Sequence, residues 1–398
     1  MGQSTDEKRV QAAFLATRNM KEEGIAALLG ASRYDVSRWL RDYKRDGILR
    51  DCTVLDRTRL DKDQIRVLEA FEEGAELLGR IHEATPKGLP HVRRIRVYGS
   101  GRKANSIRGL DISNRTFGRQ IATDVRDLIL QCRHCMVAWG RLLGGVVEEI
   151  RATFPTGLAR RKVEFYPACG DPIGAFNANT TPSALCAELD RVFNRSLRSH
   201  KYSLAGVPAV IPGDLRSDEE RQVLKSYVER SDAYRAIFGE GDARKDIDCI
   251  ITGVGGAESA AVGEENGFGL YTQECLKTLG VKRPWLSEHV LGDIAGVYIE
   301  KPDLKDKERK ALAEKRELWL GVKLEDFQRC ASKARVEETP GVVVAAVGEK
   351  TLAEVIFACC TRLGIITELF IDPEMVEHLT AICNRVMPKR KDATGRLA

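Results

Sequence analysis

The first residues of the chain place apolar side chains at helical spacing. The pattern predicts one helix over Lys8–Arg18 and a second, short helix over Lys21–Leu29. Gly30 follows the second helix. Because glycine adopts the left-handed conformation at little cost, it suits the tight turn between two helices. The pattern therefore predicts a compact helical unit at the N-terminus.

A third helix is predicted directly after this turn. Ser32 stands where an N-cap belongs, and Asp35 follows three residues later, as in a capping box. Val36, Leu40 and Tyr43 recur at i, i+4 and i+7 and should face inward. The order helix, glycine turn, serine-capped helix is typical of a helix-turn-helix.

The opposite face of the third helix is basic. Between Ser32 and Arg45 there are five basic and two acidic residues, a local charge of +3. Arginine can read guanine in a major groove, while hydroxyls and other cations hold phosphates. The alternative is a solvated basic helix on an ordinary surface. We expect the DNA contacts to come from Ser32, Arg33, Tyr34, Ser37, Arg38, Arg41 and Lys44.

Beyond the helical unit, residues 58–88 form an amphipathic stretch that predicts a helical linker with a dimer contact. Short apolar runs then alternate with helical patterns, which predicts a mainly parallel, Rossmann-like α/β sheet. The predicted strands are Ile95–Tyr98, Cys135–Trp139, Lys162–Tyr166, Cys249–Gly253, Val297–Ile299, Val342–Ala346 and Ile365–Ile371. The predicted helices include Arg119–Leu130, Ser183–Phe193, Glu219–Tyr234, Thr351–Leu363 and Pro373–Val386.

Glycines cluster just after four of these strands. In an open α/β sheet, ligands bind beyond the carboxyl ends of the strands, where glycines let backbone amides approach and helix N-termini favour anions. Glycine after a strand is also common for turn reasons alone. The loops contain Gly140 with Arg141, Gly170, Gly253 with Gly255, and Gly348 with Lys350.

Composition narrows the class of protein without naming a ligand. The 398 residues are 43% hydrophobic and 30% charged, with a net charge of +5, as in a water-soluble protein of more than one domain. The beginning of the chain does not resemble a signal peptide, and no apolar run is long enough to span a bilayer. The eleven cysteines cannot all form disulfides, because their number is odd. We expect them to be free thiols in a reducing compartment. We therefore expect a cytoplasmic protein.

The residues also resemble a known family. Residues 22–33, with Val36–Leu40 and Asp46–Leu49, are similar to the DNA-binding segment of the SorC family of bacterial sugar-sensing regulators. Residues 249–256 and 292–298 resemble two segments of its effector domain, and residues 343–350 and 365–372 two more. Residues 166–192 match another stretch, in which Asn177 and Asn179 take the polar positions. The resemblance implies a sugar-phosphate-isomerase-like effector domain, and a tetramer.

Two departures bear on the ligand. Family members commonly carry a Gly-x-Thr after the second strand, where the threonine helps hold a phosphate. This chain has Gly140, Arg141 and Leu142, so the hydroxyl is missing, although arginine can make a bidentate contact in its place. The glycine pair of the last loop is reduced to Val347-Gly348. Residues 99–118 and 303–318 look like insertions, the second a charged surface helix.

Lys350 and Asp293 are the side chains with most bearing on the predicted effector. Lys350 precedes a helix at a strand end, so its ammonium can meet a ligand phosphate; the alternative is a solvated first-turn lysine. Asp293 can accept sugar hydroxyls, or it can cap a turn. The full predicted effector set is Gly140, Arg141, Gly170, Asn177, Gly253, Gly255, Asp293, Gly348 and Lys350.

Other chemistries find little support in the sequence. Cys132 and Cys135 form one CxxC pair, but structural zinc usually needs a second pair, so we expect no metal and no cofactor. The segment Tyr98–Gly101 with Asp111 resembles nucleotidyltransferases only superficially, because the second carboxylate they need is Ser113 here. The scattered histidines lack a nearby nucleophile, so we expect no catalytic residues.

The sequence thus predicts a DNA-binding regulator that responds to a sugar or sugar phosphate. The expected divisions are a helix-turn-helix domain over 1–57, a helical linker over 58–89, an effector and oligomerisation domain over 90–386, and a basic tail over 387–398. The expected partners are double-stranded operator DNA, the small-molecule effector and further copies of the chain, with no membrane. The alternative is a sugar-phosphate-processing, isomerase-like enzyme with an accessory DNA-binding domain.

Overall fold

A computed structural model describes residues 5–18, 20–50, 54–99, 107–155, 161–172, 178–195, 202–215, 217–239, 243–257 and 270–386. The chain divides into two compact units, Met1–Glu76 and Leu77–Ala398. Among the described helices, none combines the length and the apolar character that a membrane crossing requires.

The smaller unit contains the three predicted helices, which are confirmed. They are α1 (Thr5–Thr17), α2 (Glu22–Leu29) and α3 (Arg33–Arg45), followed by the antiparallel hairpin of β1 (Leu49–Arg50) and β2 (Val54–Leu55) and the 3-10 turn η1 (Arg57–Arg59). Gly30 has the left-handed conformation expected of it, with φ 57°. Val36, Leu40 and Tyr43 are buried, as the spacing predicted.

A long helix, α4 (Lys62–Ala84), contains the boundary between the units. Leu68 belongs to the core of the smaller unit, whereas Leu77 and Ile81 belong to the core of the larger one. The predicted helical stretch is therefore present. The domain limits at 57 and 89, and the dimer contact of this stretch, stay predictions.

The larger unit is built on a six-stranded sheet in the order β3-β11-β10-β6-β4-β5, with every neighbouring pair parallel. Its strands are β3 (Arg94–Val97), β4 (His134–Val137), β5 (Glu164–Pro167), β6 (Cys249–Thr252), β10 (Gly341–Ala346) and β11 (Glu368–Ile371). The predicted parallel α/β sheet is confirmed. β6 and β10 are buried along their whole length, which explains their continuous apolar sequence.

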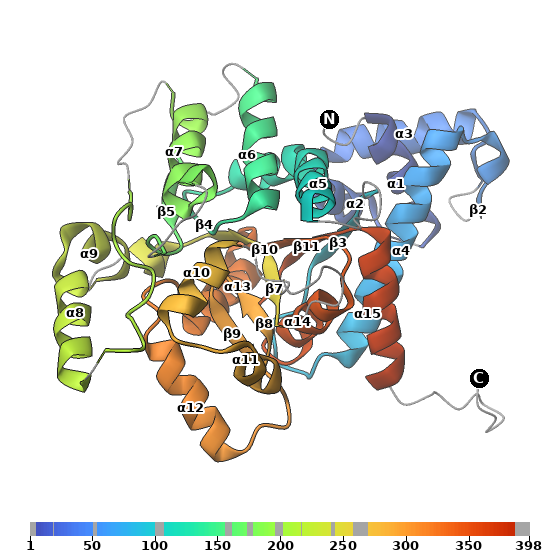
Figure 1. The fold of residues 1–398 in the computed structure, drawn as a ribbon. Coiled ribbons are helices and arrows are strands. Elements are labelled where there is room, and N and C mark those ends of the chain that lie inside the picture. The colour runs from blue at the N-terminus through green and yellow to red at the C-terminus, as the bar shows by residue number, and fades with distance from the viewer. Residues whose placement is uncertain are drawn as a thin grey trace. The chain divides into compact units, whose positions relative to one another are not determined.

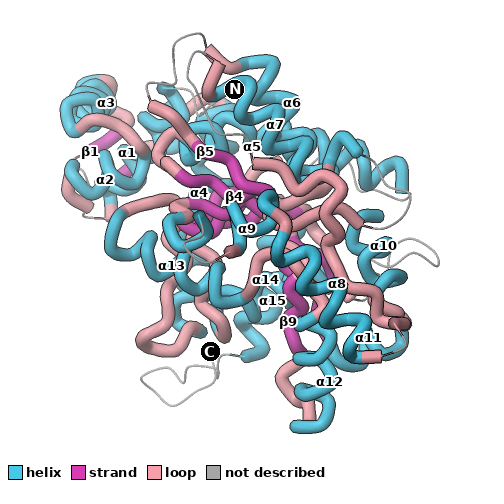
Figure 2. The backbone as a smooth tube through the Cα atoms, turned by 90° about the vertical axis from the view of Figure 1, so that its left-hand side faces the viewer, coloured by secondary structure: helices cyan, strands magenta, loops and turns pink. Residues whose placement is uncertain are grey.

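Helices cover both faces of this sheet (Figure 1). On one face lie α5 (Ile107–Ile129), α6 (Arg141–Thr153) and α7 (Pro182–Phe193); on the other lie α13 (Leu324–Glu337) and α14 (Lys350–Thr361), and α15 (Pro373–Val386) packs against α14. Figure 2 shows the strands enclosed between these helices. The arrangement is a three-layer α/β domain.

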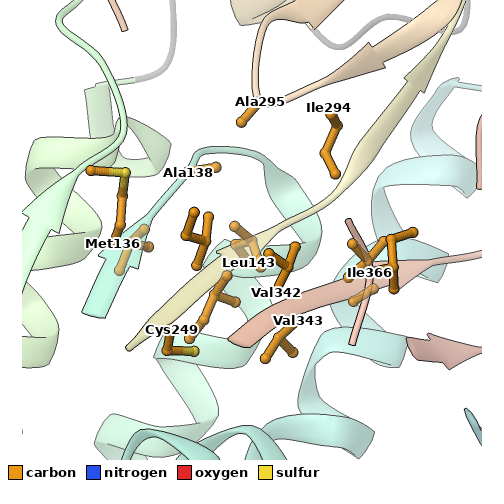
Figure 3. Packing of buried hydrophobic residues seen from close by; sticks show 14 of the residues in the cluster. Met136, Ala138, Leu143, Cys249, Ile294, Ala295, Val342, Val343 and Ile366 are labelled. Atoms are coloured by element: carbon orange, nitrogen blue, oxygen red, sulfur yellow. The ribbon is translucent and has the colours of Figure 1, made fainter. Parts of the chain in front are cut away.

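The core of the larger unit lies at the middle strands. Met136 of β4, Val342 of β10 and Leu143 of α6 belong to one buried cluster, which also includes Cys249 of β6 and Ile294 (Figure 3). All of these side chains are buried. The packing fixes the carboxyl ends of β4, β6 and β10 relative to one another.

A second, smaller sheet corrects one expectation. The predicted strand at Val297–Ile299 exists as β9 (Val297–Glu300), but it pairs antiparallel with β8 (Val290–Ile294), which pairs antiparallel with β7 (Val254–Gly256). Ala295 and Gly296 both have positive φ, 45° and 80°, as a two-residue hairpin turn of this kind requires. The turn reverses the chain and keeps β9 out of the parallel sheet.

The predicted helix over Glu219–Tyr234 is two helices. Ser231 has an extended conformation that ends the first, and its hydroxyl caps the second by accepting from the amide of Tyr234 at 3.3 Å. The predicted charged surface helix is confirmed as α12, in which Leu312 is buried. The remaining elements are α8 (Asp218–Arg230), α9 (Asp232–Phe238), α10 (Leu270–Thr278), α11 (Arg283–His289), α12 (Asp306–Glu317), η2 (Ala178–Thr180) and η3 (Ala243–Asp246).

Candidate functional site

Helix α3 is anchored at its first turn by the predicted cap. The Ser32 hydroxyl accepts from the Asp35 amide at 3.1 Å and donates to the Asp35 carboxylate at 2.6 Å. The first of these bonds satisfies one of the first-turn amides that a helix cannot satisfy internally. Ser32 therefore has a structural role, whether or not it also contacts DNA.

The basic face of α3 is presented to solvent. Arg33, Tyr34, Arg38, Arg41 and Lys44 are exposed, while Ser37 is half-buried. Tyr34 is 71% exposed, so its ring and hydroxyl are accessible for contact. The predicted contact residues thus share one exposed helix face, and their contact with DNA remains a prediction.

Ion pairs organise part of that face. The Arg33 guanidinium lies 2.9 Å from a Glu23 carboxylate oxygen and 3.7 Å from one of Glu22, so it ties α3 to α2. Arg38 is 2.8 Å from the Asp35 carboxylate and lies over the Tyr34 ring at 6.0 Å. A phosphate must compete with these carboxylates, which favours a positioning role for Arg33.

The hairpin β1–β2 is a feature that the sequence did not reveal. It follows α3 directly, and Arg50 of β1 pairs with Asp56 at 3.2 Å. Its strands are two residues each, too short for any alternation to be recognised.

The predicted glycine loops come together in the larger unit. The carboxyl ends of β10, β6, β4 and β5 stand in that order along one edge of the sheet. They are followed by Gly348, Gly253, Gly140 and Gly170, respectively. Residues that are widely separated in the sequence therefore line a single edge.

A topological switch point lies in the middle of this edge. From β4 the chain continues through α6 to the outer strand β5, whereas from β6 it continues towards β10 and β11 on the other side. Connections that diverge from adjacent strands leave a crevice beyond their carboxyl ends, and this is where open α/β sheets bind ligands.

Two helix N-termini meet the same edge. α6 begins at Arg141 after Gly140, whose φ of 123° and ψ of 165° require glycine, and α14 begins at Lys350. No side chain caps either helix. The first backbone amides of both helices, and the positive ends of their dipoles, are therefore directed at the edge. Arg141 is half-buried and Lys350 is exposed. This edge favours an anionic or hydroxyl-rich ligand.

The β10–β11 side of the edge is acidic, which the sequence did not show. One carboxylate oxygen of the buried Asp372 accepts from the amides of Gly348 at 2.9 Å and Met375 at 3.0 Å. Burial and the neighbouring Glu374 raise the pKa of Glu349. Carboxylates accept hydrogen bonds from hydroxyls but repel phosphate, so this side of the edge suits a sugar ring better than a phosphate.

Glycine is required at some of the predicted positions for packing. A Cβ on Gly170 would lie 2.0 Å from the Val207 carbonyl oxygen, and one on Gly348 would lie 2.7 Å from the Glu374 Cβ. A Cβ on Gly253 would make only ordinary contact, 3.6 Å from the Ala345 oxygen. Gly170 and Gly348 therefore admit neighbouring chain segments at close range.

Asp293 makes a turn contact. It lies opposite Gly255 in the β7–β8 pairing, is buried, and accepts from the Gly296 amide at 2.7 Å. Burial raises the pKa of Asp293 to about 6, while the Gly296 amide opposes that shift. Of the two roles that the sequence left open, turn capping is the one with an observed contact, and contact with a sugar remains a prediction. Asn177 lies outside the described residues.

The cysteine pair lies in the core. Cys132 and Cys135 are buried, and Cys135 stands opposite Cys249 across the β4–β6 pairing. Within the described part of the chain, no three His, Cys, Asp or Glu side chains are grouped so as to hold a metal ion. Burial raises the pKa of both thiols of the pair. These thiols pack as small apolar groups.

Comparison with known proteins gives matches among solved structures only: no protein-family model and no curated protein sequence matches the chain. The full-length sorbitol operon regulator SorC from Klebsiella pneumoniae is 19% identical, with a TM-score of 0.51 over 94% of this chain and 99% of that one. A DeoR family transcriptional regulator from Listeria monocytogenes is 15% identical, with a TM-score of 0.52 over 78% of this chain and 99% of its own.

A third structure is the sugar-binding domain of a transcriptional repressor from Vibrio fischeri, 13% identical, with a TM-score of 0.51 over 79% of this chain and 99% of that domain. At these identities the likeness shows a shared fold. The predicted combination of a helix-turn-helix with a SorC-type α/β domain is thereby confirmed as a fold.

Proposed function

We propose that this chain is a DNA-binding transcriptional regulator whose affinity for its operator is controlled by a small carbohydrate-type effector. The proposal rests on the presence of two structural features in one chain. One is a capped, basic α3 that follows a glycine turn, and the other is an α/β domain with convergent glycine loops. The match to full-length SorC covers 94% of the chain and so includes both.

The effector is proposed to lie across the switch point of the sheet. Arg141 and the first amides of α6 suit a phosphate, whereas Lys350, flanked by Glu349, suits hydroxyls. This arrangement moves the proposed phosphate contact from Lys350 towards Arg141. The remaining predicted residues, Gly170, Asn177, Gly253, Gly255 and Asp293, belong to the proposal as supporting positions.

The alternative, a sugar-phosphate-processing enzyme, is not favoured. Isomerisation needs an acid–base pair that converges on the substrate. The two candidates in the sequence are Lys350 and Asp293, and the Asp293 carboxylate is buried against the Gly296 amide. The three solved structures described above come from transcriptional regulators.

DNA binding is tested by titrating the full-length protein onto DNA from upstream of its own coding region at several salt concentrations. Affinity should fall steeply with salt, because phosphate contacts release counterions. Arg38→Ala and Arg41→Ala should each weaken binding by about 1–3 kcal/mol where a base is read, whereas Arg309→Ala on α12 should leave it unchanged. Binding that is insensitive to salt and to both substitutions on α3 would refute the proposal.

Effector binding is tested by thermal shift with free and phosphorylated sugars. A sugar phosphate should raise the melting temperature of the parent, since a ligand that binds only the folded state stabilises it. Arg141→Ala should lose the part of the shift that is due to phosphate, and Lys350→Ala the part that free sugars share. Equal shifts in both variants and the parent would show that the ligand binds elsewhere.

The expected assembly is a homo-tetramer, and the expected location is the cytoplasm; both are part of the proposal. Paired recognition helices related by two-fold symmetry would read an operator with matching half-sites. Sedimentation equilibrium of the full chain measures the assembly directly, and a monomer at micromolar concentration would contradict it.

A further inference from the structure

A cavity of about 310 Å³ opens in the larger unit, and none of the predicted effector residues lines it. Its walls come from α8, from α9 and from the segment that follows α12, three stretches that no predicted site includes. The residues lining it are Lys225, Glu229, Tyr234, Phe238, Gly239, Glu317, Trp319, Leu320 and Lys323. Small-molecule sites in proteins begin at about this volume, so the cavity has room for a single ring.

The floor of the cavity is aromatic and apolar. Trp319, Leu320, Tyr234 and Phe238 are buried. The Tyr234 and Phe238 rings lie with centroids 5.1 Å apart, and the Trp319 indole is held by a bond from its Nε1 to the Val322 carbonyl at 2.9 Å. A preorganised aromatic surface of this kind binds the apolar face of a ring with little loss of side-chain freedom.

The rim carries charges of both signs in equal number. The Lys225 ammonium lies 3.6 Å from a Glu317 carboxylate oxygen and 4.0 Å from one of Glu229. The Lys323 ammonium donates to the carbonyls of Arg316 and Trp319, and burial lowers its pKa. A phosphate would meet the two glutamates and an amine the two lysines. The rim therefore suits a neutral ligand that can both donate and accept hydrogen bonds.

We propose that this cavity is a second ligand site and that it binds an uncharged monosaccharide ring. It is distinct from the edge of the sheet where the effector is proposed to bind, which we call the effector edge. The aromatic floor would take the apolar face of the sugar. Glu229 and Glu317 would accept from its hydroxyls, and Lys225 would donate to them.

The floor of this second site also reaches the effector edge. The Trp319 ring lies 5.8 Å from the ring of Trp139, which immediately precedes Gly140. The indole of Trp319 also packs over Gly296, where a Cβ would lie 2.3 Å from it. A sugar bound against Trp319 would therefore restrict the motion of Trp139, which is next to Gly140 and to the proposed phosphate contact at Arg141. This contact provides a physical route by which the second site acts on the first.

Tryptophan fluorescence of the full-length protein tests the second site, with D-glucose, D-galactose, D-mannose and D-xylose as the probes. At least one sugar should give a saturable change at millimolar concentration, because Trp319 forms the floor. Glu229→Gln and Lys225→Met should each weaken that response by about tenfold or more, as expected when a hydrogen bond to a charged group is lost. Gln222→Ala, on the same helix but outside the cavity, should leave it unchanged.

The outcomes separate this site from the effector edge. Glu229 is 45% exposed, so Glu229→Gln should keep the fold, and circular dichroism of the variant checks this independently. A response lost in Arg141→Ala but kept in Glu229→Gln places the sugar at the effector edge and overturns the second site. A saturable response to amino acids alone overturns the sugar class, and the absence of any saturable response overturns the site. None of these results bears on DNA binding.

Discussion

Two glycines that look equivalent in the sequence differ in what surrounds them. Gly170 and Gly253 each follow a strand of the parallel sheet. A Cβ would lie 2.0 Å from the Val207 oxygen at Gly170 but 3.6 Å from the Ala345 oxygen at Gly253. The first position is therefore occupied by glycine for packing, while the second leaves the backbone open towards the switch point.

Gly170→Ala should accordingly destabilise the fold by about 2 kcal/mol or more, because the chain at Val207 must shift to admit a methyl group. Gly253→Ala should change stability by no more than about 0.5 kcal/mol, yet weaken effector binding, since the methyl group covers a backbone that the ligand would approach. Urea unfolding and thermal shift with ligand measure the two effects. Equal losses of stability at both positions would contradict the difference in environment.

Asp293 should make stability depend on pH. Its pKa in the folded protein is about 6, above that of an unfolded aspartate, so the folded state binds the proton more tightly. The resulting stabilisation is full below the unfolded pKa and is lost as the pH rises through 6. Asp293→Asn, which keeps an oxygen for the Gly296 amide, should therefore gain relative to the parent by about 2 kcal/mol between about pH 4.5 and pH 7.5. Urea unfolding at both pH values measures this gain.

Asp248 serves as the control with the opposite sign. Burial acts to raise its pKa, but the Lys333 ammonium and the amides of Arg133 and His134 hold it below the usual value. Its stabilisation is present above the unfolded pKa and is lost as the pH falls through the folded pKa. Asp248→Asn should therefore cost more at neutral than at acidic pH. A pH trend of the same sign in both variants would refute the assignment of Asp293.

At the scale of the element, α3 carries two serines with different roles. Ser32 caps its N-terminus, and Ser37 lies on its outward face. Ser32→Ala removes the bond to the Asp35 amide and should cost about 1 kcal/mol of stability. Ser37→Ala, one turn further along the outward face, should leave stability unchanged and weaken DNA binding. Thermal unfolding and DNA titration of both variants measure these effects. The proposed interface would be misplaced if Ser37→Ala destabilised the fold and left DNA affinity intact.

Elements were predictable from sequence where a local signal marks both ends. The helix Pro373–Val386 was predicted to the residue, because a proline suits a first helical turn and a regular apolar stripe continues from it. The break at Ser231 was missed because the stripe runs through it. α6 and α13 were not among the predicted helices, since glycines or charges obscure their apolar faces.

The site was predictable only in part, for a related reason. Glycine after a strand is a local signal, and it located the loops that line the edge of the sheet. The acidic side of that edge depends on the pairing of β10 with β11, which brings Glu374 next to Glu349. The second cavity joins α8 and α9 to the segment after α12 in the same way. Such groupings depend on tertiary contacts, which no pattern within one segment encodes.

At the scale of the whole molecule, a regulator must couple its two ligands. If the effector changes the affinity for operator DNA by some factor, operator DNA must change the affinity for the effector by the same factor, because both describe one coupling free energy. Such couplings are typically about 5–150-fold. We therefore expect the effector dissociation constant, measured by calorimetry with and without saturating operator, to shift within this range. The DNA dissociation constant should shift by an equal factor with and without effector.

Arg38→Ala is the control for this coupling. At a DNA concentration too low for the variant to bind, it should abolish the shift in effector affinity while leaving effector binding itself intact. An effector affinity that does not change with DNA would mean that the α/β unit binds its ligand for some purpose other than control of DNA binding.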